Sequence, residues 1–168
     1  MVAVLAFAVV AAAIALGWSV RDRRDAQRPV EGNTAEGVGA VVGSADLKAD
    51  VRAVAEDAAA KVFSYSHESL TADKAAARAL LTGEMLEQYD DTMAGVVSTS
   101  LANETVVSAT VLGSALISVT ERDATVLVFV NQRTTGTDLK RPLLDLDRVV
   151  VTLRRASGEW KVSELDAL

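Results

Sequence analysis

The C-terminal third of the chain alternates apolar and polar residues with the two-residue period of half-buried β-strands. β-Branched residues dominate these runs, and short polar turns separate most of them. The pattern predicts an antiparallel meander of four strands near 105–120, 124–130, 144–155 and 160–165, with a longer loop over 131–142. On the first strand, the apolar odd positions expected on the buried face are Val107, Ala109, Val111, Ala115, Ile117 and Val119.

Helical periodicity precedes the strands. Ser44 is a typical N-cap, and an apolar stripe with spacings of three and four residues follows it. A second helix is predicted from Thr71 to Leu81, and a third from Thr82 to about Val97. A sheet with one apolar face needs a covering layer, so residues 44–168 are predicted to form an α+β domain of three helices packed on a curved four-stranded sheet. The stripe of the first helix contains Leu47, Val51, Val54, Ala58, Val62 and Tyr65.

The N-terminal residues 1–20 carry no charge. A helix of this length spans about 30 Å, the thickness of the hydrocarbon core of a bilayer. We expect a single transmembrane anchor; the alternative of a cleaved signal peptide is less favoured, because the run is long and lacks a basic start. A linker follows at 21–43, where Pro29 and four glycines interrupt any helix. The anchor residues expected in the membrane include Leu5, Phe7, Ile14, Leu16 and Trp18.

The flanking charges bear on the orientation of this anchor. Arg21, Arg23, Arg24 and Arg28 follow the apolar run, and no Lys or Arg precedes it within the chain. By the positive-inside rule alone, the C-terminal domain would lie in the cytoplasm.

Composition excludes several function classes. The net charge is -6, and the pI is about 4.8. Nucleic acid is therefore a poor partner, because phosphate binding needs a basic face. There is no cysteine, which rules out disulfides, thiolate nucleophiles and cysteine zinc sites.

Candidate catalytic chemistry is sparse. The only histidine, His67, lies among serines and beside Glu68, but neighbours on one helix turn point in different directions, so we interpret the group as a polar helix end. Asp145 and Asp147 share a strand face and are either paired carboxylates or solvent-facing residues. No metal-ligand spacing and no glycine-rich phosphate loop is present. We expect no catalytic, cofactor or metal site.

A set of large side chains is distributed over the expected helices and strands. These residue types form either an ordinary core or the lining of a lipid pocket between helices and sheet. The candidate pocket-lining residues are Tyr65, Met85, Tyr89, Met93, Phe129 and Trp160.

Several short stretches, in order along nearly the whole chain, carry a resemblance to a known family. They are the single N-terminal apolar run, the tyrosine-bearing first helix, Leu80–Glu84 with Tyr89, Val128–Gln132, Asp147–Leu153 and Gly158–Val162. In this order the chain resembles the Mce-associated membrane proteins of actinobacteria, accessory proteins of mammalian-cell-entry (Mce) lipid transporters.

This resemblance implies a cone-like domain of the nuclear transport factor 2-like, or SnoaL-like, type on the outer side of the inner membrane. It also implies a non-enzymatic accessory or scaffold subunit of an Mce-type lipid-uptake transporter in the cell envelope. Its partners would be transporter subunits, the bilayer through residues 1–20, and possible lipid ligands. The alternatives are a membrane-tethered lipid carrier and a small cone-fold enzyme acting on an apolar substrate.

Overall fold

The computed structural model describes residues 44–168. The predicted anchor and linker, with Leu5, Phe7, Ile14, Leu16 and Trp18, lie outside the described residues. Within 44–168, no helix has both the length and the apolar character needed to cross a membrane.

The described residues form an α+β domain. The sheet is entirely antiparallel, and its strands follow the order of the sequence, β1-β2-β3-β4-β5. The meander predicted from the sequence is thus confirmed, but the described sheet has five strands rather than four. The helices are α2 (Ala45–Val62), α3 (Leu70–Arg78) and α4 (Gly83–Ala102), and the strands are β1 (Tyr65–Ser66), β2 (Val106–Val119), β3 (Asp123–Thr135), β4 (Leu143–Ala156) and β5 (Glu159–Ala167).

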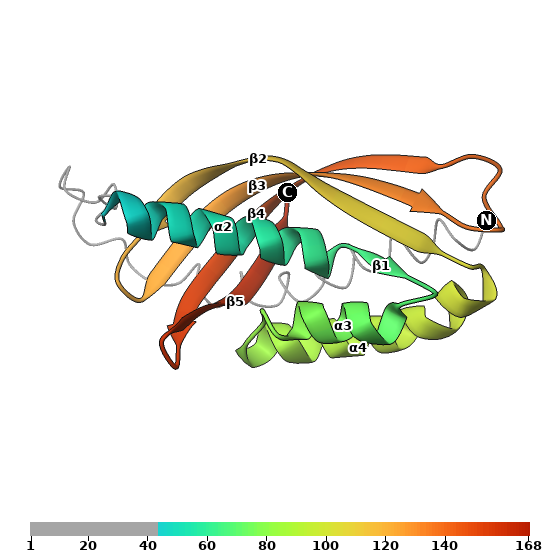
Figure 1. Cartoon of the computed structure of the whole chain (residues 1–168), viewed down its shortest axis with the longest axis horizontal. Coiled ribbons are helices and arrows are strands. Elements are labelled where there is room, and N and C mark those ends of the chain that lie inside the picture. Colours follow the sequence, from blue (N-terminus) through green and yellow to red (C-terminus); the bar gives the residue numbers. More distant parts are fainter. Residues whose placement is uncertain (1–43) are drawn as a thin grey trace, which may run out of the picture.

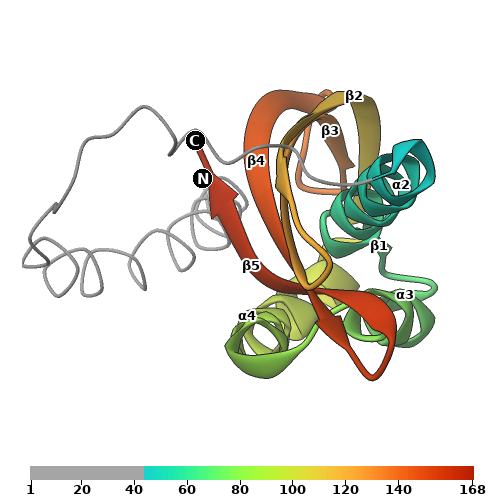
Figure 2. The same cartoon turned by 90° about the vertical axis from the view of Figure 1, so that its left-hand side faces the viewer.

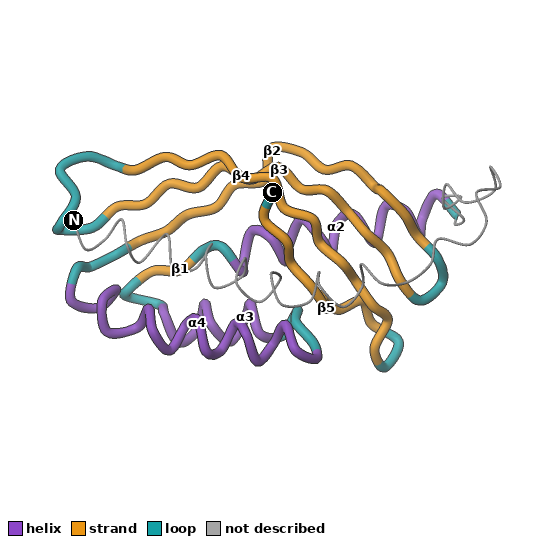
Figure 3. Tube along the Cα trace, turned by 180° about the vertical axis from the view of Figure 1, so that it is seen from behind, coloured by secondary structure: helices purple, strands orange, loops and turns teal. Residues whose placement is uncertain are grey.

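The three helices lie on one side of a strongly curved sheet. Helix α2 runs along the inner face of the long strands, while α3 and α4 lie side by side below β1 and next to β5 (Figure 1). Figure 2 shows the sheet curling around α2, and Figure 3 shows β4 and β5 passing in front of α2 when seen from behind. We call the side that carries the helices the inner face and the opposite side the outer face.

Helix α2 forms as the sequence predicts. Ser44 is its N-cap, and the Ser44 side chain accepts a hydrogen bond of 3.1 Å from the Leu47 backbone N–H. The helix ends at Val62, so Tyr65 lies beyond it, in β1. The buried residues of α2 are Val51, Ala55, Ala58, Ala59 and Val62.

The two later helices differ from the prediction at their ends. Helix α3 begins at Leu70, with Ser69 rather than Thr71 as the N-cap residue, and it ends at Arg78 rather than Leu81. Leu81 instead forms an isolated bridge with Val162 of β5. Helix α4 continues past Val97 to Ala102.

Strand β2 contains two β-bulges, which correct the predicted burial pattern. Register shifts occur between Val111 and Gly113 and between Leu116 and Ser118. A bulge places an extra residue in one strand, so the inward-facing positions change from odd to even after it. Leu116 therefore packs against the core, whereas Ala115 and Ile117, which the alternation placed on the buried face, are exposed.

The segment 131–135 is part of β3 rather than the predicted loop. It pairs with β2 on one side and with β4 on the other. Its polar residues Gln132 and Thr134 are buried, because they continue the inward alternation of Val126, Val128 and Val130.

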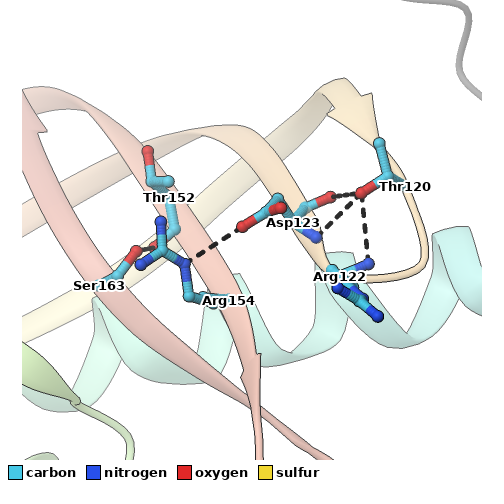
Figure 4. Close-up of polar contacts among 6 residues, drawn as sticks. All are labelled: Thr120, Arg122, Asp123, Thr152, Arg154 and Ser163. Carbon is cyan, nitrogen blue, oxygen red and sulfur yellow. Dashed lines mark hydrogen bonds and ion pairs between the residues drawn. The ribbon is translucent and has the colours of Figure 1, made fainter.

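Two tight turns join the remaining strands. At the β2–β3 turn, the Thr120 hydroxyl accepts from the backbone N–H groups of Arg122 and Asp123 and donates to the Asp123 carbonyl, and Arg154 reaches the Asp123 carboxylate at 3.2 Å (Figure 4). At the β4–β5 turn, Ser157 and Gly158 both have positive φ, which matches the right-handed twist of a hairpin.

The core lies between α2, α4 and the inner face of β3, β4 and β5. Its largest fully buried side chain is Leu153 of β4, followed by valines from α2 and all four long strands. This layer holds the helices against the sheet, because burial of aliphatic side chains is the main favourable term in folding.

Candidate functional site

Four of the six candidate pocket-lining residues are buried in the hydrophobic core. Met85, Tyr89 and Met93 line the inward side of α4, and Trp160 lies on β5. Burial raises the pKa of the Tyr89 phenol to about 12, and the Asp73 carboxylate adds to this rise. Together these residues form one packed layer between α4 and the sheet.

The other two candidates lie apart from this layer. Tyr65, in β1, is half-buried; burial raises its pKa, while a side-chain hydrogen bond with Ser100 lowers it. Phe129 occupies an odd position of β3, points to the outer face and is 39% exposed. The structure therefore brings five of the six to the inner side and separates Phe129 from them. Their role as pocket lining stays a prediction.

A shallow cleft lies between the start of α3 and the end of α4. It has a volume of about 400 Å³. The His67 backbone N–H donates to the Thr105 carbonyl at 2.9 Å, and its Nδ1 atom is buried without a hydrogen-bond partner. Exposed Leu101 and half-buried Val97 contribute an apolar wall. The cleft is lined by His67, Glu68, Ser69, Leu70, Thr71, Ala72, Lys74, Val97 and Leu101.

The serines around His67 use their hydroxyls elsewhere. Ser64 Oγ accepts from the Ala109 N–H at 2.9 Å, and Ser66 Oγ accepts from the backbone N–H two residues on. Ser69 Oγ donates to Asp73 Oδ2 at 2.7 Å. The Asp73 carboxylate thus links the Ser69 hydroxyl to the Ser66 backbone N–H, from which it accepts at 2.9 Å.

A second polar group lies on the inner face, where β3 and β4 pass beyond α2. Gln132 Nε2 donates to Asp147 Oδ2 at 2.5 Å, and Asp145 lies on the same face. Partial burial raises the pKa of the Asp147 carboxyl, the Asp145 carboxylate raises it further, and the bond from Gln132 lowers it. Asp147 is thus a partly desolvated strand residue, whereas Asp145 is exposed.

Sequence reasoning missed Gln132, the partner of the Asp147 carboxylate. Gln132, Thr134 and Ser100 are the buried polar residues of the described chain, yet the first two lie in a segment that we expected to be a loop. The signal was present in the alternation of apolar residues that ends at Val130, because the next inward position after it is Gln132.

The outer face of the sheet carries large exposed side chains. Leu146 is 72% exposed, Leu144 is 65% exposed, and Leu112, at the first bulge of β2, is 62% exposed. The register places the first two on the same side as Phe129, because residues paired across antiparallel strands share a face. We call the set Leu112, Ile117, Phe129, Leu144 and Leu146 the outer apolar face.

No known protein-family model matches the chain. The chain is 33% identical over 113 residues to the uncharacterized protein Rv1362c of Mycobacterium tuberculosis, covering 67% of this chain and 51% of that protein. It thus spans about half the length of this relative. It is also 32% identical over 132 residues to the outer membrane protein Rv1973 of the same species, covering 77% of this chain and 81% of that protein.

Solved structures share the fold. An IcmL-like type IV secretion system protein of Legionella pneumophila aligns with a TM-score of 0.61 at 12% identity, over 72% of this chain and 91% of that one. The VirB8 protein of Agrobacterium tumefaciens gives 0.60 at 11% identity, over 76% and 95%. The periplasmic domain of DotI gives 0.58 at 17% identity, over 77% and 99%.

These likenesses agree with the architecture described above. At such low identities the solved structures establish the fold alone, an α+β domain arranged as in the VirB8 protein and the periplasmic domain of DotI. The family is shown instead by Rv1973, because the alignment covers most of both chains. With 32% identity over 81% of that protein, the chain belongs to the family of the mycobacterial outer membrane protein Rv1973.

Proposed function

We propose that the chain is a non-enzymatic accessory or scaffold subunit of a protein complex in the cell envelope. The observation that carries this proposal is the fold. A domain of the same arrangement forms the periplasmic domain of DotI and the VirB8 protein, and it aligns with nearly the full length of both. An IcmL-like protein of a type IV secretion system supports the same role.

The polar groups also favour a binding role over catalysis. In the described part of the chain, His67 and the Asp145–Asp147 pair lie in separate places, one at the α3–α4 cleft and the other on the β3–β4 strands. Catalysis needs a nucleophile, base and stabilising donors that converge within hydrogen-bond reach. The cleft offers an apolar wall of Val97 and Leu101, which suits a protein partner better.

The more specific form of the proposal is an accessory subunit of an Mce-type lipid-uptake transporter. The resemblance of the sequence stretches from Leu80 to Val162 supports it. One apolar run of about 20 residues encloses no path for a substrate, so the contribution to transport would come through association. The small residues of that run, Ala11 to Gly17, permit close helix packing.

Affinity purification of the tagged full chain in mild detergent tests this role. We expect Mce-type transporter subunits to copurify, and we expect the association to be lost when residues 1–20 are replaced by an unrelated leucine-rich span. If the exchanged protein still copurifies, the domain at 44–168 carries the contact. If neither form brings down a transporter, the proposed partner is wrong.

Complementation distinguishes the scaffold from an enzyme. Alanine at His67, Asp145 or Asp147 should leave cellular function intact at unchanged protein level. Loss of function from any one of these variants would favour an enzyme instead. Binding of radiolabelled phospholipid or fatty acid to the full chain would identify a lipid carrier, for which the cleft of about 400 Å³ is the candidate volume.

The proposed location is the inner membrane, with one span and the domain on the extracytoplasmic side. The periplasmic position of the DotI domain supports this orientation, whereas the arginines after residue 20 oppose it. We expect a reporter that works only outside the cytoplasm to be active when it is fused after Leu168. Activity only in the cytoplasm would reverse the orientation.

A further inference from the structure

The two faces of the β3–β4 hairpin differ sharply in charge. Strand alternation places Asp145 and Asp147 on the inner face, with Gln132. It places Arg133 and Arg148 on the outer face, in the same cross-strand rows as Leu144 and Phe129. The outward positions of β3 from 129 to 135 and of β4 from 144 to 148 therefore carry arginine and no carboxylate.

The loop that closes the hairpin adds to this basic character. Residues 140–146 are exposed without interruption. Lys140 and Arg141 precede Pro142 and two consecutive leucines, and Asp138 is the one acidic residue of the loop. We define the hairpin face as Leu112, Phe129, Arg133, Lys140, Arg141, Leu144, Leu146 and Arg148.

This combination is unusual for the chain as a whole, whose net charge is -6. Farther along the outer face the charges are mixed, because Arg154 pairs with Asp123 on one side and with Lys161 on the other, and Asp166 lies opposite Val150. A protein partner for the hairpin face would have to be both apolar and anionic. An anionic lipid bilayer has both properties at its surface, where leucine side chains enter the acyl boundary and basic residues meet headgroups.

We propose that the hairpin face lies on an anionic lipid surface, so that the domain rests on the membrane that holds its anchor. This inference uses the proposed membrane anchor but not the proposed transporter. The lipid is defined by its chemistry, a bilayer with negatively charged headgroups.

The length of the linker is compatible with this position. The β3–β4 hairpin lies at the opposite end of the molecule from the start of α2 (Figure 1). The 14 residues of β4 extend about 46 Å at roughly 3.3 Å per residue. The segment 21–43 reaches at most about 75 to 80 Å when extended, so it is long enough to let the hairpin reach the bilayer. Tethering also raises the local concentration of the lipid surface, so a weak contact is sufficient.

Because the chain contains no cysteine, single cysteines can report the contact directly. The full chain carrying Leu144→Cys, labelled with an environment-sensitive fluorophore, is reconstituted into phosphatidylcholine vesicles with or without 30% phosphatidylglycerol. We expect brominated acyl chains to quench the label, and its emission to shift to the blue, only when phosphatidylglycerol is present. The same label at Glu87→Cys, an exposed position of α4, should remain unquenched.

A matched pair of arginine variants tests the role of charge. Arg148→Gln on the hairpin face should weaken the phosphatidylglycerol-dependent quenching about fivefold, and 0.5 M salt should weaken it further. Arg122→Gln removes the same charge from an exposed turn at the far end of β3 and should have no effect. Flotation of each variant with the vesicles shows separately whether its anchor is inserted in the membrane.

Three results would overturn the proposal. The first is an unquenched label at position 144 in a chain that floats with the vesicles. The second is equal quenching with and without phosphatidylglycerol. The third is disulfide cross-linking of Leu144→Cys between copies in place of quenching, which would assign the hairpin face to a second copy of the chain.

Discussion

Gln132 lies opposite Asp145 in the β3–β4 register, yet its side-chain amide donates to Asp147, two residues farther along the strand, at 2.5 Å. This diagonal hydrogen bond lies where the inner face changes from apolar to polar, because Val130 pairs with Asp147 and Val128 pairs with Val149. A buried amide needs a partner, and the partly desolvated carboxylate provides one. The bond thus allows a polar residue, Gln132, to occupy the next buried position of β3 after Val130.

Replacing Asp147 with asparagine tests this environment. Partial burial raises the pKa of Asp147 above its ordinary value of 3.8, so the folded state holds the proton more tightly than the unfolded chain. The stability that the protonated carboxyl contributes is present below pH 3.8 and is lost as the pH rises through the folded pKa. Asp147→Asn keeps an oxygen for Gln132 without the charge, so at pH 7 it should be more stable than the parent chain, by less than about 1 kcal/mol because the group is partly exposed.

Thermal unfolding of the full chain in mild detergent, followed from pH 3.5 to pH 8, measures this difference. The advantage of Asp147→Asn should shrink as the pH falls toward 3.5. Asp91→Asn, at an exposed position of α4, controls for the loss of one negative charge. A constant difference at every pH would contradict the explanation.

Two leucines of β4 offer a matched comparison of the sheet faces. Leu153 is fully buried, whereas Leu144 is 65% exposed on the outer face. Leu153→Ala removes the same atoms as Leu144→Ala but leaves a cavity, so we expect it to lower the free energy of unfolding by about 2 to 5 kcal/mol. Leu144→Ala should change it by no more than about 0.5 kcal/mol. Denaturant titration followed by the fluorescence of buried Trp160 compares the two; equal losses would contradict the assigned faces.

The sequence predicts the parts of this fold that depend on local chemistry. Ser44 begins α2 because its hydroxyl caps the helix, and the polar turn at 156–159 closes a hairpin through the positive φ of Ser157 and Gly158. These features depend on a few neighbouring residues. The α+β class follows when the apolar faces of the predicted helices are packed against the apolar face of the predicted sheet.

The features that the sequence did not predict depend on distant partners. Tyr65 continues the apolar period of α2, but pairing with Val107 places it in β1. Leu112 interrupts the alternation of β2, and only its unpaired position opposite β3 identifies it as a bulge. Gln132 has the polarity of a loop residue, but it pairs with Ala109 of β2 and Asp145 of β4 and so lies in a strand. In each case a tertiary contact overrides local propensity.

The ionisation of Tyr89 should report the packing of α4. Its pKa is raised to about 12, mainly by burial, while an unfolded tyrosine titrates near 10. Stability that the neutral phenol contributes is therefore complete below pH 10 and is lost between about pH 10 and 12. Tyr65 also has a raised pKa, so absorbance at 295 nm should show two late titrations, and Tyr89→Phe should remove the one near pH 12. Titration of Tyr89 near pH 10 in the folded protein would contradict its burial.

The Asp73 side chain, on α3, connects this helix to β1. Its Oδ2 atom accepts hydrogen bonds from the Ser66 backbone N–H at 2.9 Å and from the Ser69 hydroxyl at 2.7 Å. Asp73→Ala leaves the partly buried Ser66 N–H without this partner, which should cost about 1 to 3 kcal/mol of unfolding free energy. Asp73→Asn retains an acceptor oxygen and should cost less than about 1 kcal/mol.

The two Asp73 variants should have the same effect on Tyr89, because both remove the negative charge that helps to raise its pKa. Its pKa should fall from about 12 but stay above 10, since burial is the larger cause and remains. The free energy of unfolding should therefore differ between Asp73→Ala and Asp73→Asn, whereas the Tyr89 pKa measured at 295 nm should be the same in both. If asparagine destabilises as much as alanine, the hydrogen bond to Ser66 is not the source of the loss. If neither variant moves the Tyr89 titration, the carboxylate does not act on the phenol, and the rise in pKa comes from burial alone.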